Sequence, residues 1–170
     1  SRFGESPCLA VLRERRLAKL GLSYPHDVAL ETILKDGEGQ TIEFIEKFPD
    51  QAHELAKELA AFGTSNAGTI FLGIADDGTV VGLKGMGNPK TRDNLRTRIE
   101  GVSTNGILPS LPIRVKFDIV KRRNICVVQV PKGSESVYYT KNGVPYVRHG
   151  SMSRPALPQE VNELVRRYLE

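Results

Sequence analysis

The spacing of hydrophobic and polar positions in the first half of the chain predicts two strands. Residues 41–45 alternate, which places Ile42 and Phe44 on one face of a strand and Glu43 on the other. Residues 69–75 form an apolar, β-branched run, which is typical of a buried strand. The two runs are separated by enough chain for a helix, so they predict a strand–helix–strand unit.

Several segments carry apolar residues at helical spacing instead. The segment 50–62 predicts an amphipathic helix between the two strands, and 90–102 predicts another after them. Weaker stripes at 5–20 and 28–34 predict a helical lead-in, and Pro158 is well placed to begin a closing helix. In the 50–62 helix we expect the outer face to hold Glu54, Lys57 and Glu58. In the closing helix we expect the residues that face inward to be Val161, Leu164, Val165 and Leu169.

The second half of the chain predicts hairpins. Runs at 112–120 and 125–130 are rich in Val and Ile and flank a cationic turn at 121–124. Strands at 136–140 and 144–148 flank Asn142-Gly143, a dipeptide that favours a type I′ turn. About four helices and seven strands predict an α+β domain, with a mixed β-sheet and flanking helices. We expect residues 1–35 to be a helical lead-in and residues 36–170 to be the domain itself.

Cysteine content and hydropathy indicate the cellular compartment in which the protein is expected. Cys8 and Cys126 are isolated thiols without metal-ligand neighbours, which argues for a reducing compartment and against a disulfide scaffold. No apolar run is long enough to span a membrane, and no signal peptide is recognisable. The sequence therefore predicts a cytoplasmic protein.

The charge is distributed unevenly along the chain. The formal net charge is +4, but residues 1–83 carry −5 and residues 84–154 carry +10. A segment this basic favours a polyanionic partner, because each Lys or Arg that meets a phosphate releases condensed counterions. The alternative is that these charges only solvate the surface, and the asymmetry alone leaves the two open.

Carboxylates flank the predicted strand–helix–strand unit. Glu38 and Glu43 lie near the first strand, and Asp76 lies where the second strand ends. Hard divalent cations take oxygen ligands, so this set is a candidate site for metal-assisted phosphodiester cleavage. The alternative is structural: Asp76-Asp77-Gly78 is ordinary turn chemistry, and Glu43 could pair with Lys47.

Two loops are candidates for phosphate contacts. The segment 82–91 lies between a strand and a helix, but it lacks the lysine that a Walker loop needs directly after its second glycine. The segment 146–154 follows a hairpin and carries Arg148, His149 and Arg154 together with hydroxyl side chains. Such a loop suits contacts to phosphate oxygens.

Four stretches in this order resemble the AlbA-like (AlbA-2 type) domain of the Schlafen family. The similarity runs from about Glu38 to Pro158. At the second position after Glu43, where the family usually has Lys, this chain has Ile45. The stretches that carry the resemblance are Glu38–Phe44, Ala60–Phe62, Gly68–Gly78 with Val81-Gly82, and Tyr146–Ser151 with Arg154.

The resemblance implies a nucleic-acid-binding domain and raises the prospect of catalysis. Some Schlafen members cleave tRNA or rRNA with two glutamates, one aspartate and a divalent metal. Matched residue by residue, those acids fall on Glu38, Glu43 and Asp76, which would bind Mg²⁺ or Mn²⁺. We therefore expect a metal-dependent endoribonuclease acting on structured RNA such as tRNA. The alternative is a non-catalytic DNA- or RNA-binding module of a transcriptional regulator.

The same resemblance guides the expected partners. RNA is favoured over DNA, and because full-length Schlafen cores pair two such lobes, a single lobe is expected to form a homodimer. The side chains expected to hold the nucleic-acid backbone are Lys47, Lys84, Arg122, Arg123, Arg148 and Arg154.

Overall fold

The protein is described by a computed structural model over residues 26–170. The helix predicted within residues 5–20 lies outside the described residues. The chain divides between Asp36 and Gly37 into two compact units. The described part of the first unit is helix α2 (His26–Asp36), which confirms the helix predicted at 28–34. No helix among the described residues is long and apolar enough to cross a membrane.

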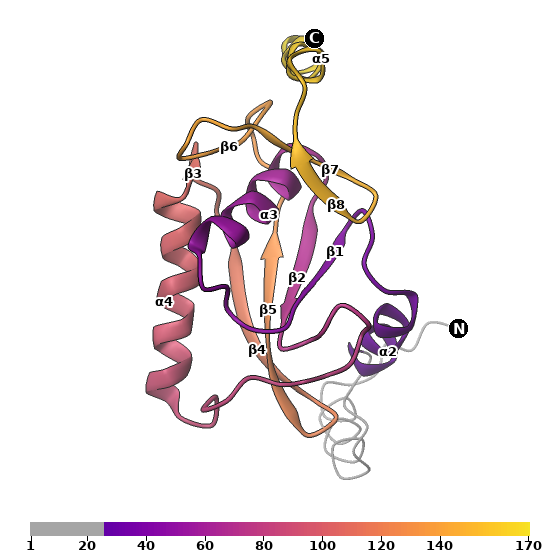
Figure 1. The fold of residues 1–170 in the computed structure, drawn as a ribbon, viewed down its shortest axis with the longest axis vertical. Coiled ribbons are helices and arrows are strands. Elements are labelled where there is room, and N and C mark those ends of the chain that lie inside the picture. The colour runs from indigo at the N-terminus through magenta and orange to yellow at the C-terminus, as the bar shows by residue number, and fades with distance from the viewer. Residues whose placement is uncertain (1–25) are drawn as a thin grey trace, which may run out of the picture. The chain divides into compact units, whose positions relative to one another are not determined.

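The second unit is built on a four-stranded mixed sheet with the order β1-β2-β5-β4. Strand β1 (Ile42–Ile45) pairs in parallel with β2 (Gly68–Leu72), while β5 (Arg123–Val130) pairs antiparallel with β2 and with β4 (Arg114–Val120). Figure 1 shows these strands side by side. The α+β class and the mixed sheet with flanking helices are therefore confirmed.

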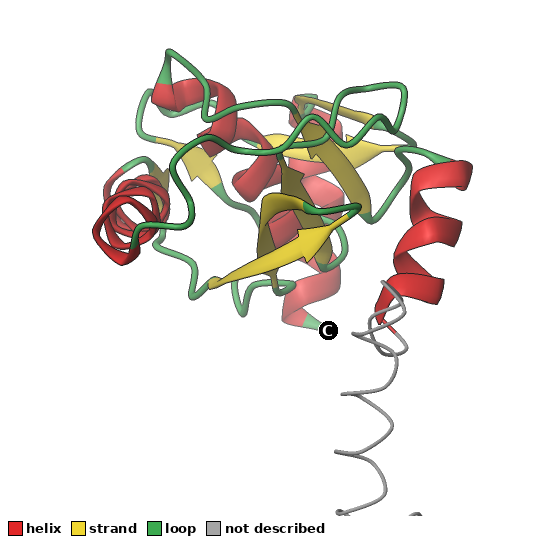
Figure 2. Ribbon diagram, turned by 90° about the horizontal axis from the view of Figure 1, so that it is seen from below, coloured by secondary structure: helices red, strands yellow, loops and turns green. Residues whose placement is uncertain are grey.

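Two helices pack on one face of this sheet. Helix α3 (Ala52–Thr64) connects β1 to β2, and α4 (Pro89–Asn105) lies against α3 and β4. Figure 2 gives the view from below, in which α4 is seen nearly end-on and the strands lie beside it. The helices and the sheet share one hydrophobic core, which includes Leu55, Leu59, Phe62, Ile70, Leu72, Ile99, Cys126 and Val128.

The alternation predicted for β1 is confirmed and determines where its carboxylate points. Phe44 is buried on the side of Phe71, with the two ring centroids 6.1 Å apart. Ile45 packs instead against the core beneath α3. Because successive strand residues point to opposite faces, Glu43 lies on the α3 side with Ile45.

The segment 136–149 forms a hairpin of a different kind from the predicted one. The Thr140 amide donates to the Val144 carbonyl at 2.9 Å, and Gly143 has φ 80°. Asn142 is not in the left-handed region, so the predicted type I′ turn is wrong, because that turn needs positive φ at both central residues. The flanking strands β6 (Tyr139–Thr140) and β7 (Tyr146–His149) pair mainly elsewhere, with β3 (Ile107–Leu108) and β8 (Met152–Pro155).

The type I′ geometry occurs instead at the β4–β5 turn. Val120 pairs with Arg123, which leaves Lys121 and Arg122 as the two turn residues, with φ of 47° and 61°. Among the described residues these are the positive-φ positions that are not glycine. Left-handed backbone costs an L-residue roughly 1–2 kcal/mol. The turn therefore keeps two cationic side chains where Asn-Gly would be less strained.

The closing helix α5 (Pro158–Leu169) begins at Pro158 as predicted, but its predicted inward face is only partly covered, because Val161 and Leu164 are half-buried while Val165 and Leu169 are exposed. None of its residues is buried, and Val165 and Leu169 are 38% and 77% exposed. Figure 1 shows α5 standing off the end of β8, beyond the sheet and the two helices that cover it.

Candidate functional site

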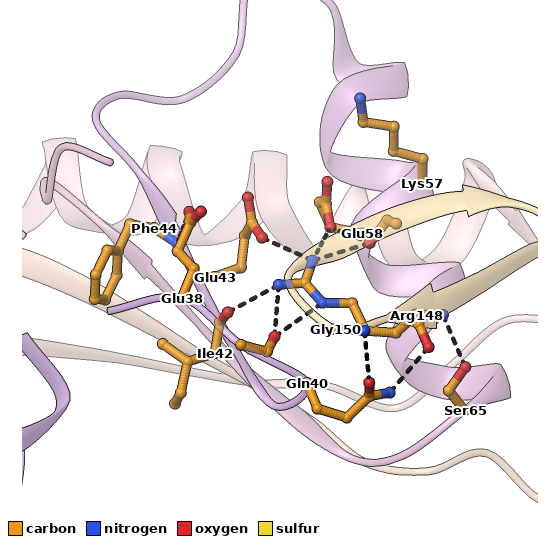
Figure 3. Close-up of polar contacts among 12 residues, drawn as sticks. Glu38, Gln40, Ile42, Glu43, Phe44, Lys57, Glu58, Ser65, Arg148 and Gly150 are labelled. Carbon is orange, nitrogen blue, oxygen red and sulfur yellow. Dashed lines mark hydrogen bonds and ion pairs between the residues drawn. The ribbon is translucent and has the colours of Figure 1, made fainter. Parts of the chain in front are cut away.

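The centre of the candidate site is the guanidinium of Arg148, which β7 carries against α3. The side chain is 0% exposed. Its Nη1 atom lies 2.7 Å from Oε2 of Glu43 and 3.0 Å from Oε2 of Glu58 (Figure 3). One buried cation therefore lies between a carboxylate of β1 and a carboxylate of α3.

The other polar groups of this side chain are also engaged. Nη2 donates to the carbonyls of Gly39 and Ile42 at 2.8 and 2.9 Å, and Nε donates to Gly39 at 3.1 Å. Nη1 also donates to the Ser153 hydroxyl at 3.1 Å, and the guanidinium lies 4.8 Å from the centroid of the Phe62 ring. A buried charge is tolerated only when its donors are paired as completely as these are. Through these contacts Arg148 joins β1, α3 and the β7–β8 hairpin.

Gln40 and Ser65 fix the backbone around Arg148. The Arg148 amide donates to the Ser65 hydroxyl at 2.8 Å, just beyond the end of α3. Gln40 donates from its amide nitrogen to the Arg148 carbonyl and accepts from the Gly150 amide, each at 2.9 Å. The segment before β1 is thereby clamped to β7 (Figure 3).

Glu58 corrects one sequence prediction, because it faces inward rather than outward. It is buried on α3, and its Oε2 atom accepts from Nη1 of Arg148 and from the Ser153 hydroxyl. Burial raises the pKa of this carboxyl above its usual range, while Ser153 and Arg148 act in the opposite direction. The helical spacing did contain a signal: Glu58 lies three residues after Leu55 and four before Phe62, both of which are fully buried.

Glu43 and Glu38 belong to the same acidic cluster. Burial raises the pKa of Glu43 to about 7, and the nearby charges of Glu58 and Glu38 add to this shift while Arg148 opposes it. The 2.7 Å contact to Arg148 is an ion pair without hydrogen-bond geometry, so buried Oε2 of Glu43 lacks a hydrogen-bond donor among the described residues. Glu38 accepts from the Phe44 amide at 3.0 Å.

Asp76, the third predicted acid, lies elsewhere. Glu43 pairs in register with Ile70, whereas Asp76 follows the end of β2 and is exposed in the turn that the Ile74–Val80 bridge closes. It is not among the charges that shift the pKa of Glu43. Within residues 26–170, no three His, Cys, Asp or Glu side chains are grouped to hold a metal ion. The structure thus brings Glu38 and Glu43 together with Glu58, and not with Asp76.

Four of the predicted cationic residues lie toward the other end of the sheet. Lys47 follows the end of β1, and the segment before Lys84 runs beside the β4–β5 turn, where the Leu83 amide donates to Asn124 at 2.7 Å. Arg123 donates to the Val81 carbonyl at 3.1 Å. We call the group formed by Lys84, Lys121, Arg122 and Arg123 the cationic end; all four side chains are exposed.

Arg148 requires a correction, and Arg154 has an acidic partner within the chain. Arg148 was predicted to bind a phosphate backbone, but its side chain is buried and its donors are already used. Arg154 makes a two-pronged contact with Glu160 at 2.8 and 2.5 Å, which holds the pKa of Glu160 down to about 2. Both arginines therefore serve internal ion pairs in this structure.

Comparison with known proteins identifies the domain. Residues 38–157 match the family described as Schlafen, AlbA_2. A solved structure with a similar fold is the DIP2311 protein from Corynebacterium diphtheriae, at 22% sequence identity and a TM-score of 0.55. The alignment covers 82% of this chain but 32% of that one, so this chain spans about a third of that protein's length. Among curated proteins, none matches the sequence.

Proposed function

Because the chain belongs to the Schlafen AlbA_2 family, whose membership indicates a nucleic-acid-binding domain, we propose that it binds the phosphate backbone through the cationic end. Lys84, Lys121 and Arg122 form no ion pair with any described residue, so their charges are available to a ligand. Lys47, which is exposed beside Asp50 at 3.6 Å, would extend this surface.

The observation that carries the proposal is the conformation of the β4–β5 turn. Lys121 and Arg122 occupy left-handed backbone without the glycine or asparagine that such a turn favours. Strained positions persist where the surroundings or a function require them. Two adjacent cations at an exposed tip are suited to phosphate oxygens, and the strain is consistent with a functional need for their charge.

For the ligand we propose RNA, with structured RNA such as tRNA favoured by the family resemblance. DNA, bound by a non-catalytic module of a transcriptional regulator, is the alternative. Parallel titrations of a tRNA and of a DNA duplex of equal charge separate the two.

The double substitution Arg122→Glu with Arg123→Glu tests the cationic end. We expect at least about tenfold weaker binding and a salt dependence whose slope falls by about 2, since each lost phosphate contact removes close to one released counterion. The measurement is fluorescence anisotropy of labelled tRNA over a salt series. Lys132→Glu with Lys141→Glu is the matched control, because it makes the same charge change at exposed positions away from the β4–β5 turn. An equal loss in both double variants would mean that net charge, rather than this surface, governs binding.

As a second candidate function we propose a metal-dependent endoribonuclease that uses Glu38, Glu43 and Asp76 with Mg²⁺ or Mn²⁺. One observation favours it: Oε2 of Glu43 is buried without a hydrogen-bond donor in the described chain, as a ligand atom could be. The present arrangement does not fit a metal centre, because the Arg148 guanidinium already lies against Glu43 and Glu58, and Asp76 is not part of the cluster. We therefore derive no catalytic step through a metal.

The cleavage proposal is tested by incubating tRNA with the protein, with and without Mn²⁺. Metal-dependent cleavage that disappears in both Glu43→Gln and Asp76→Asn would support the proposed trio. Cleavage that survives Glu43→Gln would exclude it. If there is no cleavage but the tRNA still binds, the binding function stands alone.

We also propose that the protein acts as a homodimer, which would double the number of cationic ends without further sequence. A cytoplasmic location is proposed with it, and the free, buried thiol of Cys126 is consistent with a reducing compartment.

A further inference from the structure

A pocket of about 550 Å³ opens between the start of α3, the second half of α4 and the turn that joins β6 to β7. Figure 1 shows the two helices lying side by side. The Lys141 amide donates to the Gly106 carbonyl at 3.0 Å, which ties the turn to the residue after α4. The pocket shares no residue with the cationic end or with the cluster around Arg148. Its volume suits one small ligand, so it is a separate candidate site.

One wall of this pocket contains Gly101, from the interior of α4. Glycine weakens a helix interior relative to alanine, so packing or an unusual backbone conformation normally explains its presence. Neither explanation applies here. Gly101 is not among the glycines with positive φ, and a Cβ built on it would contact no other part of the chain within 4 Å. The absent side chain therefore leaves space free along the pocket wall.

The charges around the pocket favour an anion. Arg98 and Lys141 both line it and are exposed, and neither forms an ion pair with any described residue. The carboxylate of Asp50 is also in the wall, but it lies 3.6 Å from Lys47, which offsets its charge. Two cations are thus available to a negatively charged ligand.

Arg98 also provides a flat surface. Its guanidinium carbon lies 4.0 Å from the centroid of the Phe48 ring, and Phe48 packs against the hydrophobic core. A guanidinium packed against one ring offers its other face to a second flat group, and nucleobases stack on arginine in this way. The amide side chains of Asn105 and Asn142 add donors and acceptors for a base edge or a ribose hydroxyl.

We propose that this pocket binds a nucleoside monophosphate, with Arg98 against the base and Lys141 on the phosphate. A simple anion would leave the Arg98–Phe48 pair unused, and a neutral flat ligand would leave the charge of Lys141 unused. Such a unit has two sources, a free nucleotide and the end of an RNA strand, and the last test below distinguishes them. The inference does not depend on nucleic-acid binding by the cationic end.

The first test is isothermal titration calorimetry of the full chain with AMP, GMP, CMP and UMP. We expect at least one of them to bind one to one, with a dissociation constant below about 1 mM. The matching nucleoside and inorganic phosphate should each bind at least about tenfold more weakly, since each lacks one half of the contacts. No saturable binding of any of the four, or equally tight binding of inorganic phosphate, would overturn the proposal.

The second test changes the pocket wall. Gly101→Ala should raise the melting temperature by about 2–4 °C, because alanine favours a helix and its Cβ meets no other part of the chain. Gly101→Leu fills the space and should weaken nucleotide binding at least about tenfold. A folded Gly101→Leu variant that binds the nucleotide normally would overturn the proposal.

The charge of Lys141 is tested separately, at an exposed position where folding does not depend on the side chain. Lys141→Gln should weaken nucleotide binding at least about fivefold. Lys132→Gln is the matched control, since it removes the same charge from an exposed lysine outside the pocket. Equal losses in the two variants would mean that net charge governs binding, and would reject the pocket.

The last test uses tRNA to separate the sources of the nucleotide and the two binding sites. With a free nucleotide as ligand, Gly101→Leu should leave tRNA affinity unchanged. With the end of an RNA strand as ligand, Gly101→Leu should weaken tRNA binding, and tRNA should displace the mononucleotide. In both cases Arg122→Glu with Arg123→Glu should leave mononucleotide binding intact. Loss of mononucleotide binding in that double variant would place the ligand at the cationic end and overturn the pocket assignment.

Discussion

Replacing Arg148 with alanine is expected to lower the free energy of unfolding by about 3–5 kcal/mol, the usual cost of breaking a buried ion pair from one side. The substitution leaves Glu43 and Glu58 buried without their counter-ion and frees the carbonyls of Gly39 and Ile42. Urea unfolding at pH 7 measures the change. Arg148→Lys should recover little of it, because an ammonium cannot reproduce the planar fork that reaches all these acceptors.

Two comparisons make this expectation specific. Arg154→Ala breaks the contact with Glu160, but both side chains are about one third exposed, so its cost should stay within about 1 kcal/mol. Adding Glu58→Gln to Arg148→Ala should restore part of the loss, because it removes a charge that the first change left unpaired. A cost below about 1 kcal/mol for Arg148→Ala would contradict the central role of Arg148.

The local patterns that predicted the fold correctly were those that depend on one element at a time. The alternation at 41–45 fixed which face of β1 carries Glu43, and the stripe at 50–62 located α3 to within two residues. Pro158 marked the start of α5. In each case backbone periodicity alone decides the outcome, and no distant residue has to be known.

The errors arose where a residue's environment depends on a distant segment. Arg148 looked like a surface phosphate ligand because it lies among other polar residues, but Gly39, Ile42 and Glu58 enclose it from more than 80 residues away in sequence. Glu58 was assigned to solvent for the same reason. The stripe on α5 was correctly read as apolar, but periodicity does not say whether its partner is the domain's own core or another molecule.

The turns illustrate a different limit. Asn142-Gly143 favours type I′ geometry, but the surrounding strands pair with β3 and β8 and impose another turn. Lys121 and Arg122 lack that preference but adopt the geometry, because the long β4–β5 register brings Val120 opposite Arg123. Strand pairing here outweighs the preference of two residues.

The arrangement of charges also bears on function. The acidic cluster around Arg148 joins the segment before β1 to α3, whereas the cationic end lies at the β4–β5 turn. Asp76, the acid expected to complete the metal site, lies beyond β2 toward the cationic end. Binding therefore requires only the groups already exposed there. Cleavage by the proposed trio would require Arg148 to give up Glu43 and Asp76 to approach it.

Replacing Glu43 with glutamine is expected to raise the free energy of unfolding at pH 8 by on the order of 3 kcal/mol, which corresponds to a pKa moved from 4.5 to about 7. The folded state holds the proton more tightly than the unfolded chain does. The contribution of Glu43 is therefore fully present below pH 4.5 and is lost as the pH rises to about 7. Over this range the stability of the natural chain should fall, and Glu43→Gln should remove most of that fall.

Urea unfolding at intervals from pH 4 to pH 8 measures both curves. Glu58 also has a raised pKa, so a smaller decline should remain in the variant. Asp77→Asn is the control, because the pKa of Asp77 is shifted in the opposite direction. Its exposed carboxylate accepts a hydrogen bond from the Thr79 amide, which lowers its pKa. This substitution should therefore leave the fall in stability between pH 4.5 and pH 7 unchanged. Parallel curves for the natural chain and Glu43→Gln would mean that Arg148 fully neutralises Glu43. In that case the oxygen of Glu43 that lacks a hydrogen-bond donor would no longer mark this residue as a group that could exchange Arg148 for a proton or a metal ion.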